Sequence, residues 1–329
     1  MDPVDRVIVD NSPDAARTLL IIDAPALLVE GEPIAGQVRV WADDLRDREG
    51  IPTGLLVDKL DAASLTGVDL VWLRLPKALA ALDEYAELIA KHADPTVQVV
   101  AGGRVKYMTH SMNEVLAAHF GNVSASLGQQ KSRALRAAIP MPSEPTWPRS
   151  KVHTDLGITL WSHGGTFAGT KVDLGTQLMI KHLKKIKGKD VLDLGSGNGV
   201  LATLIARHDN QARVHAVDVS WDAWDATRRT AEFNRVKVDA RLAADLENFG
   251  DASMDLVVCN PPFHRGAAKD SEPALEMFAE AARVLSPGGE FWCVYNSHLP
   301  WKARLTDLIG PTSVVEQNTG YTLTRSERR

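Results

Sequence analysis

A chain of 329 residues, 44% of them hydrophobic and 24% charged, has the composition of a globular protein and the length of roughly two domains. Its net charge of −5 excludes a protein that coats nucleic acid through a general positive charge, although it does not exclude a local basic patch. No apolar run approaches the roughly 18 residues of a membrane span, and the N-terminus carries no secretion signal. We therefore expect a cytoplasmic protein, and we expect it to be a monomer.

The two halves of the chain differ in charge. Residues 1–150 hold 15 Lys and Arg against 20 Asp and Glu, whereas residues 151–329 hold 22 against 22. The two cysteines, Cys259 and Cys293, each lie in an apolar run, and their spacing suits neither a metal site nor a redox pair. We expect both to be reduced core residues and predict no metal site.

The first 138 residues resemble a weakened copy of the second half. RTLLIIDAP (17–25) has the pattern of a first strand, and GVDLVWLRLP (67–76) stands where DLVVCNPP stands later in the chain. The segment from Val99 onward then parallels the end of the chain. We interpret this as an ancient duplication. No glycine-rich turn follows the first strand, so we do not expect this copy to hold a nucleotide.

A proline-rich segment separates the two halves. IPMPSEPTWP (139–148) has four prolines, which neither a helix nor a central strand accommodates. The sequence therefore predicts a domain over residues 1–138, a linker over 139–150 and a second domain over 151–329.

The second half alternates strand-like and helix-like segments, which predicts a largely parallel sheet covered by helices. The expected helices span 200–207, 221–234 and 273–285. The expected strands span 190–195, 213–220, 239–246, 255–260 and 288–296, with two more at 313–317 and 321–325.

A glycine-rich turn joins the first of these strands to the first helix. Its glycines permit a tight turn and close approach of the backbone to a ligand, and the helix N-terminus offers free N–H groups. Val200 stands where a dinucleotide-binding motif has its third glycine, so NAD and FAD are disfavoured. The expected ligand-binding residues in this turn are Asp193, Gly195, Ser196, Gly197, Asn198 and Gly199.

Carboxylates end the next two strands. Asp218 is placed to accept both hydroxyls of a ribose, and Asp245 could accept from an adenine amino group. Asp193 suits a ligand that carries an ammonium group. An amino acid, a ribose and an adenine in that order describe S-adenosylmethionine, and we include the neighbouring Val219 and Ala244 in its expected pocket.

The fourth strand ends in Asn260-Pro261-Pro262-Phe263, followed by His264. Prolines donate no backbone hydrogen bond, so the Asn260 side-chain oxygen and the Pro261 carbonyl could accept both hydrogens of one planar NH₂ group. Such acceptors orient the nitrogen toward the methyl group without a base. Phe263 offers a face on which a flipped base could stack. We expect Asn260 to contact the cofactor as well as the substrate.

At this point a resemblance is visible. GGTFAGTKVDLGTQLMI (164–180), VLDLGSGNGV (191–200), VVCNPPFH (257–264) and YNSHLPWKARL (295–305) resemble the bacterial ribosomal RNA guanine-N2 methyltransferase family. The resemblance covers the second half and implies that Phe167, Asp173 and Thr176 line the cofactor pocket. The family also carries a degenerate N-terminal duplicate thought to bind RNA.

The sequence thus predicts an α/β protein with two tandem Rossmann-like methyltransferase domains, the first degenerate. We expect methyl transfer from S-adenosylmethionine to guanine N2 of ribosomal RNA, with ribosomal RNA or a ribosomal subunit as partner. Methylation of adenine N6 or of a protein glutamine stays open, because each substrate presents a planar NH₂ group. So does a non-catalytic RNA-binding or ribosome-assembly factor.

Basic residues occur at three places. A lysine run at 181–189 leads into the N-terminal end of the first strand, away from the expected ligand edge, and we interpret it as a solvated face. Arg265 and Lys269 follow the catalytic motif and are better placed to meet phosphates. In the first half, the expected RNA contacts are Arg104, Lys106, Lys131, Arg133 and Arg136.

Overall fold

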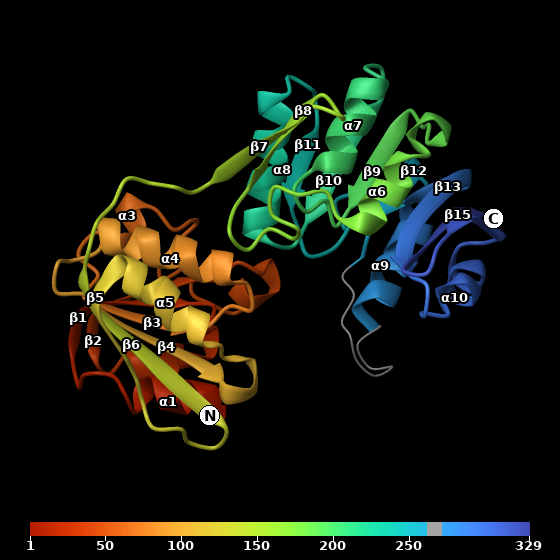
Figure 1. Ribbon diagram of the computed structural model, residues 1–329. Coiled ribbons are helices and arrows are strands. Elements are labelled where there is room, and N and C mark those ends of the chain that lie inside the picture. Colours follow the sequence, from red (N-terminus) through yellow and green to blue (C-terminus); the bar gives the residue numbers. More distant parts are fainter. Residues whose placement is uncertain (262–271) are drawn as a thin grey trace. The chain divides into compact units, whose positions relative to one another are not determined.

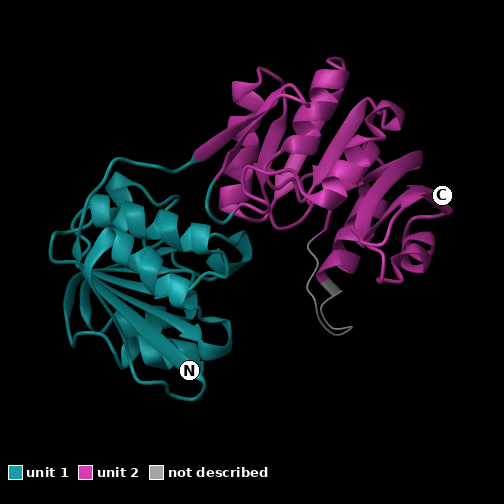
Figure 2. Ribbon diagram, in the orientation of Figure 1, with its two compact units in different colours: residues 1–148, 163–165 teal, residues 149–162, 166–329 magenta. Residues whose placement is uncertain are grey.

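The computed structural model describes residues 1–261 and 272–329. The chain forms two compact units: unit 1 comprises residues 1–148 and 163–165, and unit 2 comprises residues 149–162 and 166–329 (Figure 2). None of the helices in the described ranges combines the length and the apolar character needed to cross a bilayer.

Unit 1 is a six-stranded sheet with helices packed on it (Figure 1). Helix α1 lies close against strand β4, where a Cβ on Gly102 would come within 2.5 Å of Ile8. Helices α4 and α5 pack side by side over the sheet. The strands are β1 (Ala16–Ile22), β2 (Ala35–Trp41), β3 (Leu70–Arg74), β4 (Gln98–Arg104), β5 (Phe120–Ala125) and β6 (Ser132–Pro140); the helices are α1 (Pro3–Val9), α2 (Leu28–Gly31), α3 (Ala62–Leu65), α4 (Leu79–His92) and α5 (His110–His119).

Unit 2 is a seven-stranded sheet with an added hairpin. Helix α7 buries every residue from Val200 to Ala206, which fixes it tightly beside the first strand. The sheet strands are β9 (Asp190–Leu194), β10 (Arg213–Asp218), β11 (Asp239–Leu242), β12 (Met254–Cys259), β13 (Leu285–Asn296), β14 (Thr312–Gln317) and β15 (Tyr321–Glu327); β7 (Arg149–His153) and β8 (Ile158–Ser162) form the hairpin; the α-helices are α6 (Leu174–Ile180), α7 (Val200–His208), α8 (Trp221–Phe233), α9 (Glu272–Val284) and α10 (Trp301–Leu308).

The two sheets repeat one topology. Unit 1 has the strand order β2-β1-β3-β4-β6-β5, and unit 2 has β11-β10-β9-β12-β13-β15-β14. In both, one strand runs antiparallel to all the others: β6 lies between β4 and β5, as β15 lies between β13 and β14. Unit 1 lacks a counterpart of the outer strand β11. The predicted tandem α/β fold is confirmed, and the shared order supports the duplication.

One prediction about local structure in unit 2 is wrong, and one element was missed. Strand β11 ends at Leu242 rather than at residue 246, so Asp245 follows the strand by three residues and does not end it. The β7–β8 hairpin was not predicted, because its exposed first strand lacks an apolar pattern. Of the proline-rich segment, residues 141–147 form neither helix nor strand, and Glu87 of α4 accepts a bond from the Thr146 N–H at 2.9 Å.

The turn after the first strand of unit 1 differs from its counterpart in unit 2. Asp23 stands after β1 with a left-handed φ of 53°, where Gly195 follows β9 with a φ of 76°. The Asp23 carboxylate is turned inward and accepts hydrogen bonds from the Asp43 N–H at 2.8 Å and the Tyr85 hydroxyl at 3.0 Å. A side chain therefore occupies the turn that glycine leaves open in unit 2.

Candidate active site

Three glycines shape the turn between β9 and α7. Gly195, Gly197 and Gly199 all have left-handed φ values, between 58° and 76°, which side chains other than glycine rarely adopt. A Cβ on Gly199 would also lie 2.8 Å from the Thr227 Cα. The turn is held by the Val217 carbonyl, which accepts bonds from the Gly195 and Ser196 N–H groups. Gly199 therefore serves close packing of α7 against α8.

Asp193 is a buried carboxylate beneath this turn. Its side chain is 1% exposed and accepts one bond, from the Ala202 N–H at 3.0 Å. Burial raises the pKa of Asp193 to about 7, and the nearby charge of Asp218 adds to the rise. A buried carboxylate that has no cationic partner favours binding of a ligand that carries a positive charge.

Asp218 holds the glycine turn from the neighbouring strand. One carboxylate oxygen accepts from the Gly197 N–H at 2.9 Å and the other from the Ser220 N–H at 3.0 Å. The structure thus gives Asp218 a structural task in addition to the ribose contact expected of it.

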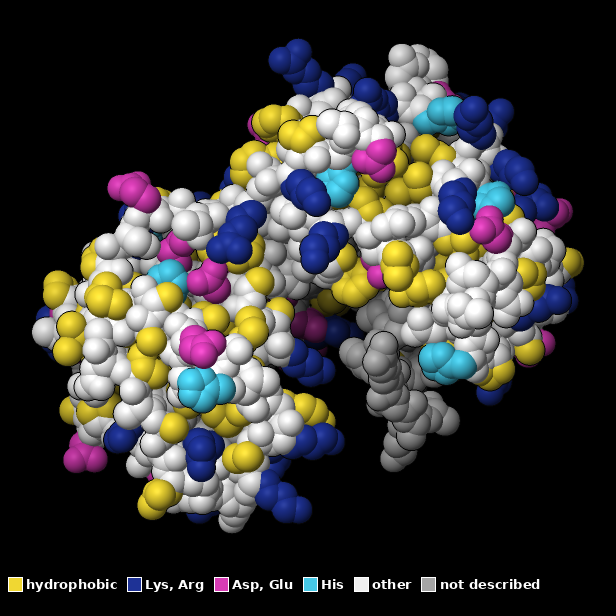
Figure 3. All heavy atoms as spheres, viewed as in Figure 1, with side chains coloured by type: hydrophobic (Ala, Val, Ile, Leu, Met, Phe, Trp, Pro, Cys, Tyr) yellow, Lys and Arg dark blue, Asp and Glu magenta, His cyan; other side chains and the backbone are white. Residues whose placement is uncertain are grey.

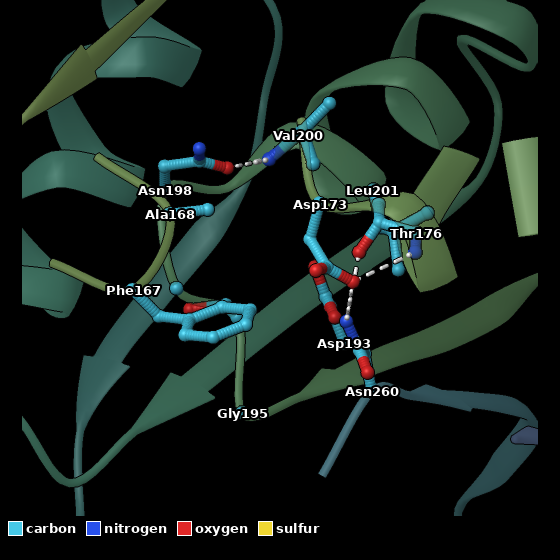
Figure 4. Close-up of a pocket in the computed structure, with 12 residues that line it drawn as sticks. Phe167, Ala168, Asp173, Thr176, Asp193, Gly195, Asn198, Val200, Leu201 and Asn260 are labelled. Atoms are coloured by element: carbon cyan, nitrogen blue, oxygen red, sulfur yellow. Dashed lines mark hydrogen bonds between the residues drawn. The ribbon is translucent and has the colours of Figure 1, made fainter. Parts of the chain in front are cut away.

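Asp173 connects helix α6 to the end of strand β12. As the N-cap of α6, it accepts from the Gly175 N–H at 2.8 Å and the Thr176 N–H at 3.3 Å through one oxygen, Oδ2. The same oxygen accepts from the Asn260 side-chain nitrogen at 3.2 Å, which also donates to the Thr176 hydroxyl at 2.9 Å (Figure 4). These contacts fix the plane of the Asn260 amide.

The Asn260 side-chain oxygen is left buried and without a hydrogen-bond partner among the described residues. The direction of the amide follows from its neighbour, because a carboxylate oxygen such as that of Asp173 accepts bonds and an amide NH₂ must face it. A buried acceptor without a donor carries a desolvation cost, which a donor from a bound molecule would offset. The site therefore presents one oriented acceptor to a substrate N–H group.

The loop before α6 forms the outer wall of the pocket. Phe167 is 60% exposed, and the two residues after it, Ala168 and Gly169, have left-handed φ values. Three successive carbonyls of the loop accept side-chain bonds. The Asn198 side-chain nitrogen donates to the Gly169 and Lys171 carbonyls at 2.8 and 2.9 Å, and His153 Nε2 lies 2.8 Å from the Thr170 carbonyl. Asn198 thus contributes by positioning this loop.

The structure gathers most of the expected site residues around one pocket. Those that line it are Phe167, Asp173, Thr176, Asp193, Gly195, Ser196, Gly197, Asn198 and Asn260, and the other lining residues are Ala168, Val200 and Leu201. The first turn of a helix after a glycine turn faces the ligand, which could have pointed to Val200 and Leu201. The pocket lining does not include Gly199, Asp218, Val219, Ala244 or Asp245.

Part of the expected catalytic motif lies outside the described residues. Asn260 and Pro261 are described, whereas Pro262, Phe263 and His264 are not, nor are Arg265 and Lys269.

Both units resemble known protein families. Residues 157–325 match the family model of the methyltransferase small domain, and residues 53–141 match the RLMG N-terminal domain. A protein of Streptomyces avermitilis called ribosomal RNA large subunit methyltransferase G is 32% identical over 80% of this chain and 72% of its own length. Its namesake in Pseudomonas aeruginosa is 34% identical over 85% of this chain and 76% of its own.

A solved structure shares the fold over the whole chain. It is a 16S rRNA N2 methyltransferase (RsmC) of T. thermophilus in complex with AdoMet and guanosine. The TM-score is 0.82, the alignment covers 100% of this chain and 92% of the other, and the sequence identity is 21%. At this identity the likeness establishes the arrangement of strands and helices.

Proposed function

This chain belongs to the methyltransferase small domain family, and from that premise we propose that it transfers a methyl group from S-adenosylmethionine to the exocyclic N2 of a guanine in ribosomal RNA. One observation carries the proposal above all: the oriented oxygen of Asn260 beside the glycine turn, which has no hydrogen-bond partner in the described parts of the chain. A cytoplasmic location and a monomeric state belong to the same proposal, and the two free, buried cysteines agree with the location.

The residues around the pocket fit S-adenosylmethionine in their chemistry. When bound, this cofactor supplies an electrophilic methyl group and carries a cationic amino acid end. Asp193 would hold the ammonium group, because it is a buried carboxylate without a cation within the described residues. Phe167 would cover the cofactor from the outer wall, and the glycine turn would let its backbone approach.

Asn260 would act on the substrate by accepting a hydrogen bond. An exocyclic amino group is planar, because its lone pair is delocalised into the ring, and it is a poor nucleophile for that reason. An acceptor fixed in the plane set by Asp173 and Thr176 orients the N–H, and with it the nitrogen, toward the electrophile. Such a contact needs no reorganisation during the reaction, and it acts in a site largely removed from water.

The nature of the substrate rests on relatives. Proteins about one third identical to this chain are named ribosomal RNA large subunit methyltransferases, and the T. thermophilus neighbour was solved with guanosine. Asn260 alone does not separate guanine N2 from adenine N6 or from a glutamine amide, because each offers a planar NH₂ group. The proposal that the substrate is RNA and that the methylated base is guanine therefore rests on the named relatives.

Unit 1 would serve as an RNA-binding partner of the catalytic unit. Tyr107 is 59% exposed, and the Lys106 ammonium lies 4.9 Å from the centre of its ring. An exposed aromatic ring beside a cation suits a nucleic-acid base next to its phosphate. Of the five expected cations, Arg104 also bonds to Asp2 at 3.1 Å, which reduces its availability to phosphate.

The direct test is methylation of isolated RNA followed by mapping. Purified protein and labelled S-adenosylmethionine are incubated with large- and small-subunit ribosomal RNA from cells that lack the gene. We expect label in one guanine, recovered as N2-methylguanosine after digestion. Label in adenine or in protein would refute the guanine assignment, and no transfer to any substrate would refute the enzyme.

The variant Asn260→Ala tests the residue that carries the proposal. Loss of one oriented polar contact should lower the single-turnover rate of methyl transfer by about 100-fold or more. Calorimetry serves as the control, since binding of S-adenosylmethionine should be largely retained. A single-turnover rate near that of the wild type would remove Asn260 from the reaction.

A further inference from the structure

Among the described residues, the edge of the unit 2 sheet that carries the pocket is acidic. Asp173, Asp193 and Asp218 lie at or near the C-terminal ends of the strands, and they suit a cationic cofactor. The same charges repel the phosphates of an RNA substrate. Since phosphate contacts supply much of the affinity for nucleic acid, cations on another surface would add to the affinity for RNA.

The opposite edge of this sheet is basic. Strands β9, β10 and β11 are parallel neighbours, so the segments that enter β9 and β11 lie at the same edge. Six exposed cations occur in these segments, and we call them the basic edge: Lys184, Lys185, Lys187, Lys189, Arg235 and Lys237. In the view of Figure 3, Lys and Arg side chains gather at the upper right over unit 2.

The cations of the basic edge are not used within unit 2. Among the described residues, no carboxylate lies within 4 Å of any of the six, and each of the six is exposed. Several arginines of the same unit are paired: Arg213 with Asp190, Arg241 with Asp239 and Arg283 with Asp251. The first two of these pairs also neutralise the carboxylates at the starts of β9 and β11.

A hollow of about 210 Å³ lies at this edge. Its lining combines the apolar side chains of Leu183, Ile186, Ile205 and Ala212 with Lys187, Gly188, His208 and Asp209. The edge therefore offers a concave surface beside its cations. Asp209 is the acidic member of this lining, and one of its oxygens accepts from the Gln211 N–H at 3.0 Å.

We propose that the basic edge binds phosphates of the ribosomal RNA at a distance from the nucleotide that is methylated. The inference rests on the proposed function, because it assigns a second contact for the same substrate. Strand β9 separates the basic edge from the pocket, and its five residues span about 16 Å. A dinucleotide in the pocket does not span this distance, whereas a long folded RNA can.

The experiment compares two quadruple variants of the full chain. One replaces Lys184, Lys185, Lys187 and Lys189 with Gln, and the other replaces them with Arg. Binding of full-length ribosomal RNA transcripts is measured between about 50 and 200 mM salt. Each phosphate contact contributes about 0.7 to 0.9 to the slope of log affinity against log salt. In the Gln variant we expect the magnitude of this salt slope to decrease by about 3 and the affinity for the transcript to fall by at least about tenfold. We expect the Arg variant to resemble the wild type in both.

Two further measurements separate this surface from the active site. Binding of S-adenosylmethionine and methylation of a dinucleotide with the mapped guanine should be the same in the Gln variant and the wild type. An unchanged salt slope for the long transcript would overturn the proposal. So would an equal loss on the dinucleotide, because the lysines would then act at the pocket. If the wild type methylates no RNA, the proposed function fails, and the binding measurement still decides the role of the edge.

Discussion

The environment of Asp193 differs strongly from that of an ordinary surface carboxylate. It is buried beneath the glycine turn, and its pKa is about 7 in the cofactor-free protein. A cationic ammonium group would stabilise the ionised form and lower this pKa. Binding of the cofactor and loss of the Asp193 proton are therefore linked.

We predict that the affinity for S-adenosylmethionine rises between pH 5.5 and 7.5. Below pH 7 the free protein holds Asp193 neutral, so binding must first remove a proton, at a cost of up to about tenfold in affinity per pH unit. Calorimetry at several pH values measures the dependence. Asp193→Asn is the control and should bind weakly at every pH, with little dependence on pH; an affinity that is flat with pH in the wild type would contradict this role.

Folding stability has the opposite pH dependence for two aspartates. Burial raises the pKa of Asp23 in unit 1, like that of Asp193, to about 7, whereas an unfolded aspartate has a pKa of about 3.9. Between these two pKa values, the folded state therefore binds more protons than the unfolded state. Above pH 7 both aspartates are ionised, and the full cost of burying their charge lowers the free energy of unfolding. This cost decreases as the pH falls through 7.

Urea unfolding of the cofactor-free protein tests this expectation. The contribution of Asp23 makes unit 1 more resistant at pH 5.5 than at pH 8, and Asp23→Asn should remove that difference because its amide is neutral at both. Equal pH dependence in the variant and the wild type would show that Asp23 does not titrate in this range.

At the scale of elements, the regular segments were predictable and the loops were not. Local sequence patterns predicted the existence of every strand from β9 to β15, and the apolar runs are clearest in the buried strands β9, β12 and β13, whereas the predicted end of the exposed strand β11 was wrong. Asn260 was predictable as well, since the end of a strand next to the glycine turn is a ligand edge. Asn198 lines the pocket, and its side-chain nitrogen also donates to carbonyls of the loop at 169–171, a contact that no local pattern encodes.

The loop before α6 gives a prediction at this scale. Asn198→Asp keeps the acceptor for the Val200 N–H but removes both donors to the loop carbonyls. At about 1 kcal/mol per hydrogen bond, the affinity for S-adenosylmethionine should fall by up to roughly thirtyfold. Trypsin should also cut after the exposed Lys171 more quickly, as the loop is released.

A matched control is available just beyond helix α7. Asn210→Asp makes the same chemical change at an exposed position whose side-chain oxygen accepts from Gln211. It should leave cofactor affinity and cleavage after Lys171 unchanged. If Asn198→Asp behaves like this control, the loop does not depend on Asn198.

At the scale of the whole molecule, a short segment far along the chain completes unit 1. His163 Nδ1 lies 2.6 Å from one oxygen of the buried Glu84, and the Gly164 N–H donates to the other at 2.6 Å. A Cβ on Gly164 would lie 2.2 Å from the Ala80 carbonyl oxygen. Only glycine fits at this position, and without residues 163–165 Glu84 would lose these two contacts.

We predict that Gly164→Ala releases this segment and destabilises unit 1. The thermal unfolding midpoint should fall, because a buried carboxylate then loses partners, and proteolysis near residue 164 should accelerate. Gly54→Ala is the control, since a Cβ there meets no atom within 4 Å, and it should be neutral or slightly stabilising. An unchanged midpoint for Gly164→Ala would mean that the segment adds nothing to unit 1.

The path of the chain between the units also limits how the two units can be exchanged by recombination. The backbone leaves unit 1 after residue 148, returns for residues 163–165 and leaves again, so it passes between the units three times. A single recombination event in the proline-rich segment would pair the Glu84 of one parent with the His163 of another. Exchange of whole domains between relatives, in nature or in a chimera, should therefore succeed only when the crossover falls after residue 165 or when both parents share this three-residue insert.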